Sequence, residues 1–558
     1  MLIGIDVGGT FTDGVLCAEG RILNTAKCPT KEKELQDSII AVLDDLLQGI
    51  KGSDITHVAI STTLVTNLLA TGGGDRVALI LIPGPGLNWH KMEFLPYTYI
   101  ARGATDFRGR IIEPLDQGQI EEIGKLIVAA DIHKVAVVGK FSQRNSSHER
   151  QAAAILKEQH PHLEVVTGFE VSGQLNFLRR AVTTYYTAMT KEKWSSFADG
   201  IKKAIRERGI TSPIYILKAD GGTMPLKMSL RYPCETVFSG PAASVMGAFA
   251  LTMDQQTSVV VDIGGTTTDL GLILEGKPLY ASRGALLGGH YSHVRSFAVR
   301  SIPLGGDSAV RLSGGEIVIG PERLGPAACF GGPAATPTDA VNVLEGGKLG
   351  HLELSSRALE EVSQQAGLTV RELAQRIVRQ VNIQLEAGIK EMFKSWEQEP
   401  AYKIWEIVNR RRVKPERVVG IGAAAGAFVP ALAGRLGCQA LVHRYSPVAN
   451  ALGAAVARPT LSILLHADTQ RQSYYLNLEG ISGKFNPAWQ LKEAKELALK
   501  QLHEIAVKRG IGRYADRYEF FLEEQFNMIR GWSTVGKLFD VGVQITPGII
   551  DEFKGVQP

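Results

Sequence analysis

Apolar and polar positions in the first third of the chain alternate between two kinds of run. Short apolar or alternating runs predict strands, and runs with apolar residues every three or four positions predict helices. Up to about residue 180 the predicted elements follow one another at 2–16, 34–47, 58–60, 77–82, 120–130, 135–138 and 149–158. This alternation predicts α/β organisation.

Beyond residue 180 the pattern changes twice. A helix is expected at 185–208, a strand at 214–217 and a largely helical stretch at 359–398. A glycine-dense middle is expected to form backbone loops around a cleft, at 219–222, 239–243, 304–308 and 325–328. After residue 459, strands are expected at 473–478, 518–528 and 537–545, and a helix at 488–509. These last elements predict a small C-terminal α+β domain from about 461 to 558.

Two strand-like runs are interrupted by the same polar pattern, D-x-G-G-T-x-T-D, at 6–13 and 262–269. Apolar residues flank both copies, so each predicts a strand, a glycine turn and a returning strand. Paired glycines let the backbone approach a ligand, and turn N–H groups and Thr hydroxyls can then donate to phosphate oxygens. The leading Asp can hold Mg²⁺, or it can cap the turn. One copy alone is compatible with a plain hairpin, whereas two copies favour two jaws closing on one polyphosphate.

The candidate ligand contacts follow from these positions. The candidate magnesium ligands and catalytic groups are Asp6 and Asp262. The candidate phosphate contacts are Gly8, Gly9, Thr10, Thr12, Gly264, Gly265, Thr266 and Thr267. Asp13 and Asp269 either close the hairpins or contact the metal shell.

The duplicated hairpin resembles the phosphate-binding hairpins of the actin, hexokinase and Hsp70 superfamily. That resemblance implies two ribonuclease-H-like, actin-like ATPase lobes, which we expect at 1–180 and 181–460, and a third glycine-rich turn that receives adenosine. Residues 417–427 predict a strand, a turn of tiny residues and the start of a helix. The candidate adenosine contacts are Gly420, Gly422, Ala423 and Ala424. Taken alone, this turn is also compatible with close packing of a helix on a strand.

Composition excludes several classes of function. The chain has 558 residues, 44% of them hydrophobic and 21% charged, as in globular proteins of more than one domain. A net charge of +4 gives no basic stripe, and the charged runs at 31–34 and 410–412 are typical of solvated surface. No apolar run reaches membrane-spanning length and no signal peptide is visible. Five cysteines without a C-x-x-C motif fit reduced thiols, so we expect a cytoplasmic protein that binds neither nucleic acid nor membrane.

Further motifs extend the resemblance to one family. They stand, in order, at 61–67, 141–142, 148–149, 180–184, 220–222, 239–243, 305–308, 336–340 and 450–453. Over roughly residues 1–457 the chain resembles alpha subunits of the hydantoinase/oxoprolinase family. This resemblance implies an enzyme that uses ATP and Mg²⁺ on cyclic amides such as hydantoin, N-methylhydantoin or 5-oxoproline, commonly together with a beta subunit. Relatives also serve as ATP-using subunits of acetone and acetophenone carboxylases.

Two departures bear on the substrate. Phe177 stands where many members have an acidic residue, and Ala219-Asp220-Gly221-Gly222 stands where Ser-Asn-Gly-Gly is usual. Asp220 and Asp307 each lie in a glycine loop, where a carboxylate can orient a substrate N–H or a water. The structural alternative for each is an Asx turn.

Ring opening requires activation because resonance stabilises the amide carbonyl against water. Transfer of the γ-phosphoryl group to the amide oxygen gives an imidate phosphate that water opens. This chemistry needs positioned phosphates and neutralised charge more than covalent help from the protein. The alternatives are a nucleotide-driven partner subunit, as in the carboxylases, and a small-molecule kinase. A homo-oligomer is also compatible with the sequence.

Three other groups keep a structural alternative. The hydroxyls of 61–67 can cap a helix or face the ligand. Arg180 can bind a carboxylate or phosphate, or anchor a helix through a salt bridge. The H-x-x-H at 290–293 lacks further ligands at a recognisable spacing, so we expect a role other than metal binding.

Overall fold

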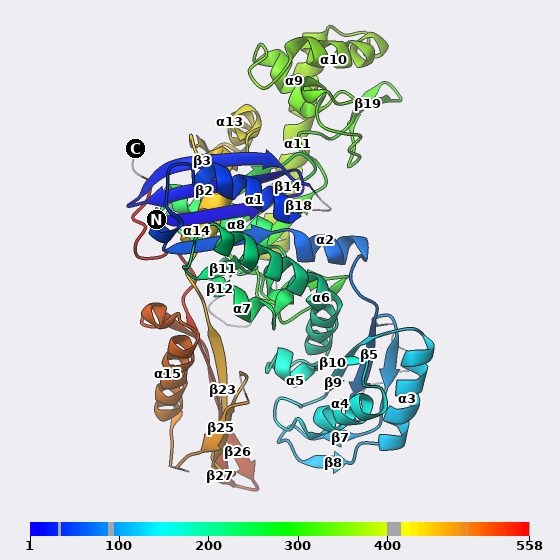
Figure 1. Ribbon diagram of the computed structural model, residues 1–558, viewed down its shortest axis with the longest axis vertical. Coiled ribbons are helices and arrows are strands. Elements are labelled where there is room, and N and C mark those ends of the chain that lie inside the picture. The colour runs from blue at the N-terminus through cyan, green and yellow to red at the C-terminus, as the bar shows by residue number, and fades with distance from the viewer. Residues whose placement is uncertain (32–34, 87–93, 399–413, 479, 487, 557–558) are drawn as a thin grey trace.

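The computed structural model describes residues 1–31, 35–86, 94–398, 414–478, 480–486 and 488–556. Residues 32–34 and 410–412, which belong to the two charged runs, lie outside the described residues. The buried apolar side chains of the described residues form four clusters, and strands and helices alternate along most of the chain. The α/β fold predicted from the sequence is therefore confirmed (Figure 1).

The first six-stranded sheet has the order β12-β11-β4-β1-β2-β3. β1 pairs antiparallel with β2 and parallel with β4, and β4 pairs parallel with β11. Its strands are β1 (Leu2–Val7), β2 (Phe11–Ala18), β3 (Arg21–Pro29), β4 (His57–Thr62), β11 (Ile214–Leu217) and β12 (Thr223–Pro225). Helices α1 (Leu35–Leu46) and α6 (Phe177–Glu207) pack against it, while α2 (Leu64–Thr71) follows β4. Two strands of this sheet thus come from beyond residue 180, and the division at that residue stays a prediction.

The second six-stranded sheet has the order β15-β14-β13-β21-β22, with β18 also paired to β14, and its strands β14-β13-β21-β22 repeat the pairing of β2-β1-β4-β11 in the first. β14 pairs antiparallel with β13, and β13 pairs parallel with β21, which pairs parallel with β22. The strands are β13 (Ser258–Ile263), β14 (Thr268–Leu274), β15 (Lys277–Pro278), β18 (Val299–Ile302), β21 (Arg417–Ile421) and β22 (Gln439–Val442). Its apolar cluster contains side chains from four helices, α9 (Pro337–Leu344), α10 (Leu352–Ala366), α11 (Val370–Glu397) and α13 (Ala425–Leu436).

Two helices of small residues lie between the sheets. α8 (Ser239–Thr252) contacts strands of both sheets, and α14 (Ala449–Val456) packs on α8 and on β1. A Cβ on Gly247 would lie 2.1 Å from the carbonyl oxygen of Ala449, and one on Gly453 would lie 2.3 Å from that of Ala243. Glycine at these two positions therefore lets the helix backbones touch.

A smaller unit of residues 77–171 has its own parallel sheet, in the order β10-β9-β5-β6. Its elements are β5 (Val77–Ile82), β6 (Thr98–Ile100), α3 (Gln117–Ala129), β9 (Lys134–Gly139), α4 (Ser147–Gln159), β10 (Glu164–Thr167) and α5 (Gly168–Val171). The Arg108–Asp468 ion pair, 3.1 Å long, joins this unit to the C-terminal sheet, and the two lie next to each other in Figure 1.

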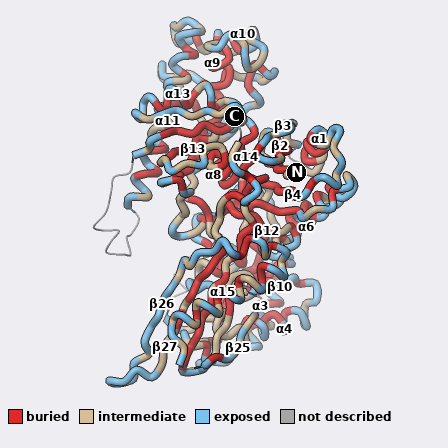
Figure 2. Tube along the Cα trace, turned by 90° about the vertical axis from the view of Figure 1, so that its left-hand side faces the viewer, coloured by how far each residue is buried: buried red, intermediate tan, exposed pale blue. Residues whose placement is uncertain are grey.

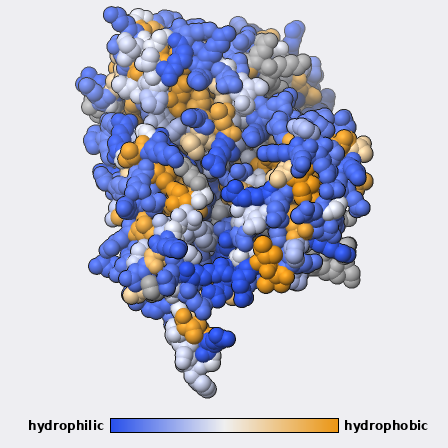
Figure 3. Space-filling view, turned by 60° about the horizontal axis from the view of Figure 1, so that its bottom comes forward, coloured by the Kyte–Doolittle hydropathy of each residue, from blue (hydrophilic) through white to orange (hydrophobic). Residues whose placement is uncertain are grey.

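The C-terminal residues form a five-stranded antiparallel sheet, β25-β24-β23-β27-β26, covered by α15 (Leu491–Lys508). Its strands are β23 (Ser462–Asp468), β24 (Ser473–Leu476), β25 (Ser482–Lys484), β26 (Tyr518–Arg530) and β27 (Ser533–Ile545). The joined ends of β26 and β27 leave the body as an arm, exposed in Figure 2 and seen as a narrow projection in Figure 3. Trp532 at its turn is fully exposed.

Candidate active site

The two D-x-G-G-T-x-T-D segments fold into hairpins of the same geometry. In the first, Asp6 lies opposite Asp13, and the N–H of Gly8 donates to the carbonyl of Phe11 at 3.0 Å. In the second, Asp262 lies opposite Asp269, and the N–H of Gly264 donates to the carbonyl of Thr267 at 3.0 Å. The predicted strand–turn–strand form of both segments is confirmed.

The tips of the two hairpins face each other. A Cβ on Gly265 would lie 3.2 Å from Thr10 Oγ1 and 2.7 Å from Asp307 Oδ2. A residue larger than glycine would therefore crowd both side chains. The Asp307 loop is fastened to the second hairpin, because the N–H groups of Gly306 and Asp307 donate to Gly264 and Gly265 at 2.9 and 2.8 Å. Segments around residues 10, 265 and 307 therefore meet at one place.

Several carboxylates are desolvated beside this meeting point. Burial raises the pKa of Asp6 to about 7, and the carboxylates of Asp13 and Asp262 add to the increase. Burial and the Asp262 charge likewise raise the pKa of Asp269 to about 7. Burial also raises the pKa of Asp13 although Lys27, 2.7 Å away, opposes the increase. A cluster of this kind is costly to ionise unless a cation joins it.

Asp262 is held differently from Asp6. Its Oδ2 accepts hydrogen bonds from Ser244 Oγ at 2.6 Å and from Asn450 Nδ2 at 2.9 Å. Asp6 Oδ1 is buried and has no hydrogen-bond partner among the described residues. An oxygen left in this state fits a hard cation such as Mg²⁺, which prefers oxygen ligands.

The described residues contain no group of three or more His, Cys, Asp or Glu side chains arranged to hold a metal by themselves. Mg²⁺ is commonly held by one or two carboxylates together with phosphates and waters. Asp6 and Asp262 fit that manner of binding, in which the nucleotide completes the coordination.

The predicted adenosine turn adjoins the second hairpin. Gly422 has a φ of +87°, and a Cβ there would lie 2.8 Å from the carbonyl of Ile263 and 3.1 Å from Asp262 Oδ1. Ala423 is exposed and Ala424 half-buried at the start of α13. Gly420 is instead packed inside, because a Cβ would lie 2.8 Å from a methyl carbon of Val429.

The phosphate candidates differ in accessibility. Gly9, Gly264 and Thr266 are exposed, while Gly8, Thr10, Gly265 and Thr267 are half-buried. Thr12 is fully buried, and its hydroxyl lies 3.0 Å from that of Thr30.

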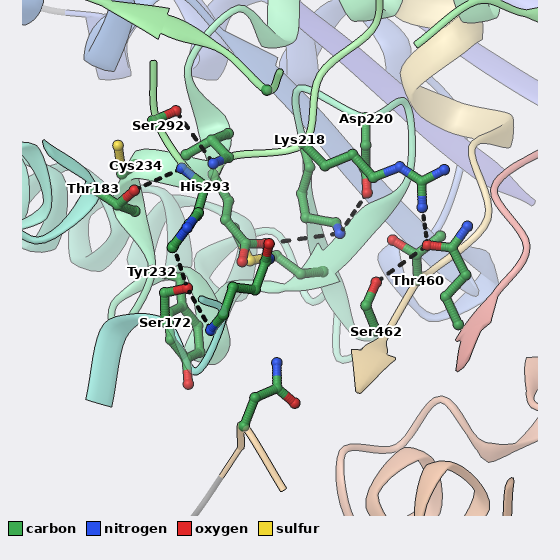
Figure 4. Close-up of a pocket in the computed structure, with 18 of the residues that line it drawn as sticks. Ser172, Thr183, Lys218, Asp220, Tyr232, Cys234, Ser292, His293, Thr460 and Ser462 are labelled. Atoms are coloured by element: carbon green, nitrogen blue, oxygen red, sulfur yellow. Dashed lines mark hydrogen bonds and ion pairs between the residues drawn. The ribbon is translucent and has the colours of Figure 1, made fainter. Parts of the chain in front are cut away.

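Asp220 and Asp307 occupy different places. Asp307 lies at the hairpin tips, where Arg323 Nη2 contacts its Oδ2 at 3.1 Å, and burial raises its pKa against that charge. Asp220 forms the Asx turn, accepting from the N–H of Gly222 at 2.9 Å, and it also pairs with Lys218 at 3.1 Å. Asp220 lines a separate cavity of about 450 Å³, shown in Figure 4. The sequence did not indicate this separation.

The remaining candidates have mostly structural contacts. Arg180 is buried and donates to the carbonyls of Gln174 and Gly139 at 2.8 and 2.6 Å. In the 61–67 segment, Thr62 Oγ1 accepts from the Leu64 N–H and Thr66 Oγ1 from the Phe238 N–H, at 3.2 and 2.9 Å. His293 Nδ1 lies 2.8 Å from Ser172 Oγ.

Sequence reasoning missed the residues that support the aspartates: Lys27, Ser244, Arg323 and the amide of Asn450 as a partner of Asp262. Ser244 directly follows the 239–243 motif and Asn450 begins the 450–453 motif. In the sequence, these two motifs could have indicated Ser244 and Asn450. Among the described residues no helix combines the length and apolar character needed to cross a membrane.

Family models cover most of the chain. A model described as hydantoinase/oxoprolinase matches residues 180–462, and one described as the hydantoinase/oxoprolinase N-terminal region matches residues 2–160.

Three curated relatives are similar at low identity. Caprolactamase subunit alpha of Pseudomonas jessenii is 25% identical, over 79% of this chain and 68% of that protein. Acetophenone carboxylase gamma subunit of Aromatoleum aromaticum is 24% identical, over 81% and 67%. The 5-oxoprolinase of Saccharomyces cerevisiae is 26% identical, over 82% of this chain and 41% of that protein. The chain thus spans about two thirds of the first two relatives and less than half of the third.

Two solved structures share the fold. Nucleotide-free acetone carboxylase matches with a TM-score of 0.73 at 18% identity, covering 99% of this chain and 88% of that chain. The ATP-dependent caprolactamase of Pseudomonas jessenii matches with a TM-score of 0.69 at 20% identity, covering 97% and 87%.

Proposed function

The chain belongs to the hydantoinase/oxoprolinase family, and from that premise we propose that it is an ATP-dependent hydrolase that opens a cyclic amide of the hydantoin, N-methylhydantoin or 5-oxoproline type. Relatives named caprolactamase and 5-oxoprolinase support an amidohydrolase. We further propose that the two six-stranded sheets are the halves of an actin-like ATPase, with a beta subunit as partner.

The facing hairpins are the observation that carries this proposal. Gly265 and Thr10 lie close enough that one ligand beside the two tips can contact both. Turn N–H groups and the hydroxyls of Thr10 and Thr266 can donate to phosphate oxygens. The adenosine turn at Gly422 adjoins Asp262, so the base and the polyphosphate can bind next to each other.

Asp6 and Asp262 would hold Mg²⁺, which supplies charge neutralisation for the phosphates when bound. Ser244 and Asn450 keep the Asp262 carboxylate in place through their hydrogen bonds. Asp307, beside Thr10 and Gly265, is placed to orient the acceptor or a water.

The proposed reaction has three steps. The amide oxygen takes the γ-phosphoryl group from ATP, giving ADP and an imidate phosphate. Water adds to the activated carbon, the ring C–N bond breaks and the nitrogen takes a proton. A second water cleaves the resulting acyl phosphate at its carbonyl carbon, so phosphate leaves with the former amide oxygen.

Oxygen tracing tests this route in the protein co-expressed with any beta subunit encoded beside it. In water enriched with ¹⁸O, one phosphate oxygen should derive from the unlabelled substrate carbonyl, and solvent oxygen should enter the new carboxylate. Phosphate that carries solvent oxygen instead would contradict this route.

That second outcome would favour the other candidate, an ATP-using subunit that drives a partner. The similarity to acetophenone carboxylase gamma subunit supports this candidate. Turnover that requires bicarbonate with acetone or acetophenone, and none with hydantoins or 5-oxoproline, would identify it.

A further inference from the structure

The cavity that contains Asp220 lies where four segments of the chain meet. One wall comes from the start of α6 with Arg179, a second from the turn after β11 with Lys218, and a third from the 280–295 segment. The C-terminal sheet supplies the last wall through Asn477 and Gln544. Figure 4 shows side chains from these segments directed toward one space. A volume of about 450 Å³ is within the range of small-molecule sites.

The cationic groups of this cavity exceed its carboxylates. Lys218 contacts both acidic lining residues, Asp220 at 3.1 Å and Glu235 at 3.8 Å. Arg179, Arg283 and Arg295 also line the cavity, and among the described residues none of these three has a carboxylate within ion-pair distance. Unpaired guanidinium groups gathered around a cavity favour an anionic ligand.

Arg295 is the most constrained of these arginines. It donates to Gln544 Oε1, which also accepts from Ser462 Oγ at 3.3 Å, and its guanidinium lies 4.2 Å from the centre of the Tyr280 ring. Gln544 is buried. The C-terminal sheet therefore helps to fix the direction of this cation.

Neutral polar atoms complete the lining. Thr460 is buried and its Oγ1 has no hydrogen-bond partner among the described residues. His293 Nε2 is likewise unpartnered there, and burial together with the Arg180 charge lowers the pKa of His293 to about 3, so the ring is neutral. A ligand with polar atoms besides its anionic group can therefore form hydrogen bonds with this lining.

The cavity also lies on the same edge of the first sheet as the first hairpin. β11 pairs parallel with β4 and β4 with β1, so Lys218 and Gly8 both follow the carboxyl end of a strand. Strands two places apart in a sheet lie about 10 Å from each other. The hydrogen bonds from Ala219 N–H to Glu235 O and from Ser239 Oγ to Thr62 O hold residues 235–239 next to the ends of β11 and β4.

We propose that this cavity binds the acceptor substrate and selects cyclic amides that carry a carboxylate, with Arg295 contacting that carboxylate. The identification of the ligand as the acceptor rests on the proposed function. Recognition of a carboxylated ring is a separate property, because it requires neither ATP nor the aspartates of the hairpins.

Calorimetry without nucleotide tests the selection with two matched pairs of ligands, 5-oxoproline against 2-pyrrolidinone and hydantoin-5-acetic acid against hydantoin. We expect at least one carboxylated member to bind about tenfold or more tighter than its uncarboxylated partner, because charge-assisted hydrogen bonds are the stronger kind. Affinities within about threefold in both pairs, or no binding by either acid, would overturn the proposal.

Variants of two cavity arginines test which side chain contacts the carboxylate of the ligand. Arg295→Gln and, separately, Arg179→Gln are compared with Arg300→Gln, which changes an exposed arginine of β18 outside the cavity. Arg295→Gln should weaken binding of the acid about tenfold, leave the uncarboxylated ring unchanged and keep ATP affinity, with thermal unfolding as a check on folding. If neither cavity variant weakens the acid more than Arg300→Gln does, the assignment is wrong.

Failure here is distinguishable from failure of the proposed function. Asp262→Ala should abolish ATP turnover but still bind the acid. If the protein does not prefer the carboxylated ligands but still turns over ATP on a cyclic amide, the assignment of the cavity is wrong and the proposed function is not affected.

Discussion

The two hairpins share one eight-residue pattern but hold their carboxylates differently. In the first, Asp6 has the pKa of about 7, and its cross-strand neighbour Asp13 is paired with Lys27. In the second, the leading Asp262 accepts two side-chain hydrogen bonds, and the cross-strand neighbour Asp269 has the pKa of about 7. The carboxyl group whose pKa is raised to about 7 therefore occupies opposite positions in the two copies.

The difference arises outside the motifs. Ser244 comes from α8 and Asn450 from α14, the two helices between the sheets, and both donate to the leading carboxylate of the second hairpin. Lys27 comes from β3, which neighbours only the first hairpin. A repeated motif thus gives equal backbone geometry and unequal electrostatics.

Removing either leading carboxylate should have the largest effect. We expect Asp262→Ala, and likewise Asp6→Ala, to abolish ATP turnover with the fold intact, because the phosphate charge loses its metal ligand in the transition state. Steady-state kinetics and circular dichroism provide the measurement. A variant with more than about a tenth of wild-type kcat, a loss below roughly 1.4 kcal/mol, would not fit this role.

Asn450→Ala should have a smaller effect. It removes one hydrogen bond to the proposed metal ligand Asp262, and hydrogen bonds to carboxylates contribute about 1.5–3 kcal/mol, so we expect ATP turnover to fall by roughly tenfold or more. Asn24→Ala is the control, because its side chain donates to a surface carbonyl at Asp45. Equal activity of both variants would show that the support of Asp262 is unimportant.

The pH dependence of stability tests the raised pKa values. Asp6 and Asp269 bind protons more tightly in the folded than in the unfolded protein, so their contribution is complete below about pH 4 and is lost as pH rises through about 7. Without Mg²⁺, the difference in Tm between pH 5 and pH 8 should shrink in Asp6→Asn and in Asp269→Asn. Unchanged differences in both variants would contradict the shifts.

Lys27→Met should have the smallest effect, because this ion pair is partly exposed and affects only the first hairpin. We expect the apparent Mg²⁺ affinity to change by about two- to fivefold. Lys277→Met on β15 of the second sheet is the matched control. A loss as large as that of Asp6→Ala would mean that Lys27 contacts the nucleotide.

Much of the fold was predictable because its signals are local. The helices near 35–46 and 491–508 and the strands at 77–82 and 214–217 follow from apolar spacing, and the structure confirms them. The sequence did not indicate β23, or the assembly of one sheet from strands as distant as β1 and β11. Pairing between distant strands depends on packing, which short-range periodicity does not encode.

The candidate site likewise has features that the sequence predicted and features that only the tertiary structure revealed. The sequence by itself determined the two glycine hairpins and their leading aspartates, because a turn of this kind depends on the residues within it. Only the tertiary structure decided that the tips of the hairpins meet, that Asp307 joins them and that Asp220 lies in another cavity. The reason is physical: pKa values, hydrogen-bond partners and cavity walls depend on side chains from α8, α14 and the C-terminal sheet, which folding brings together from distant parts of the chain.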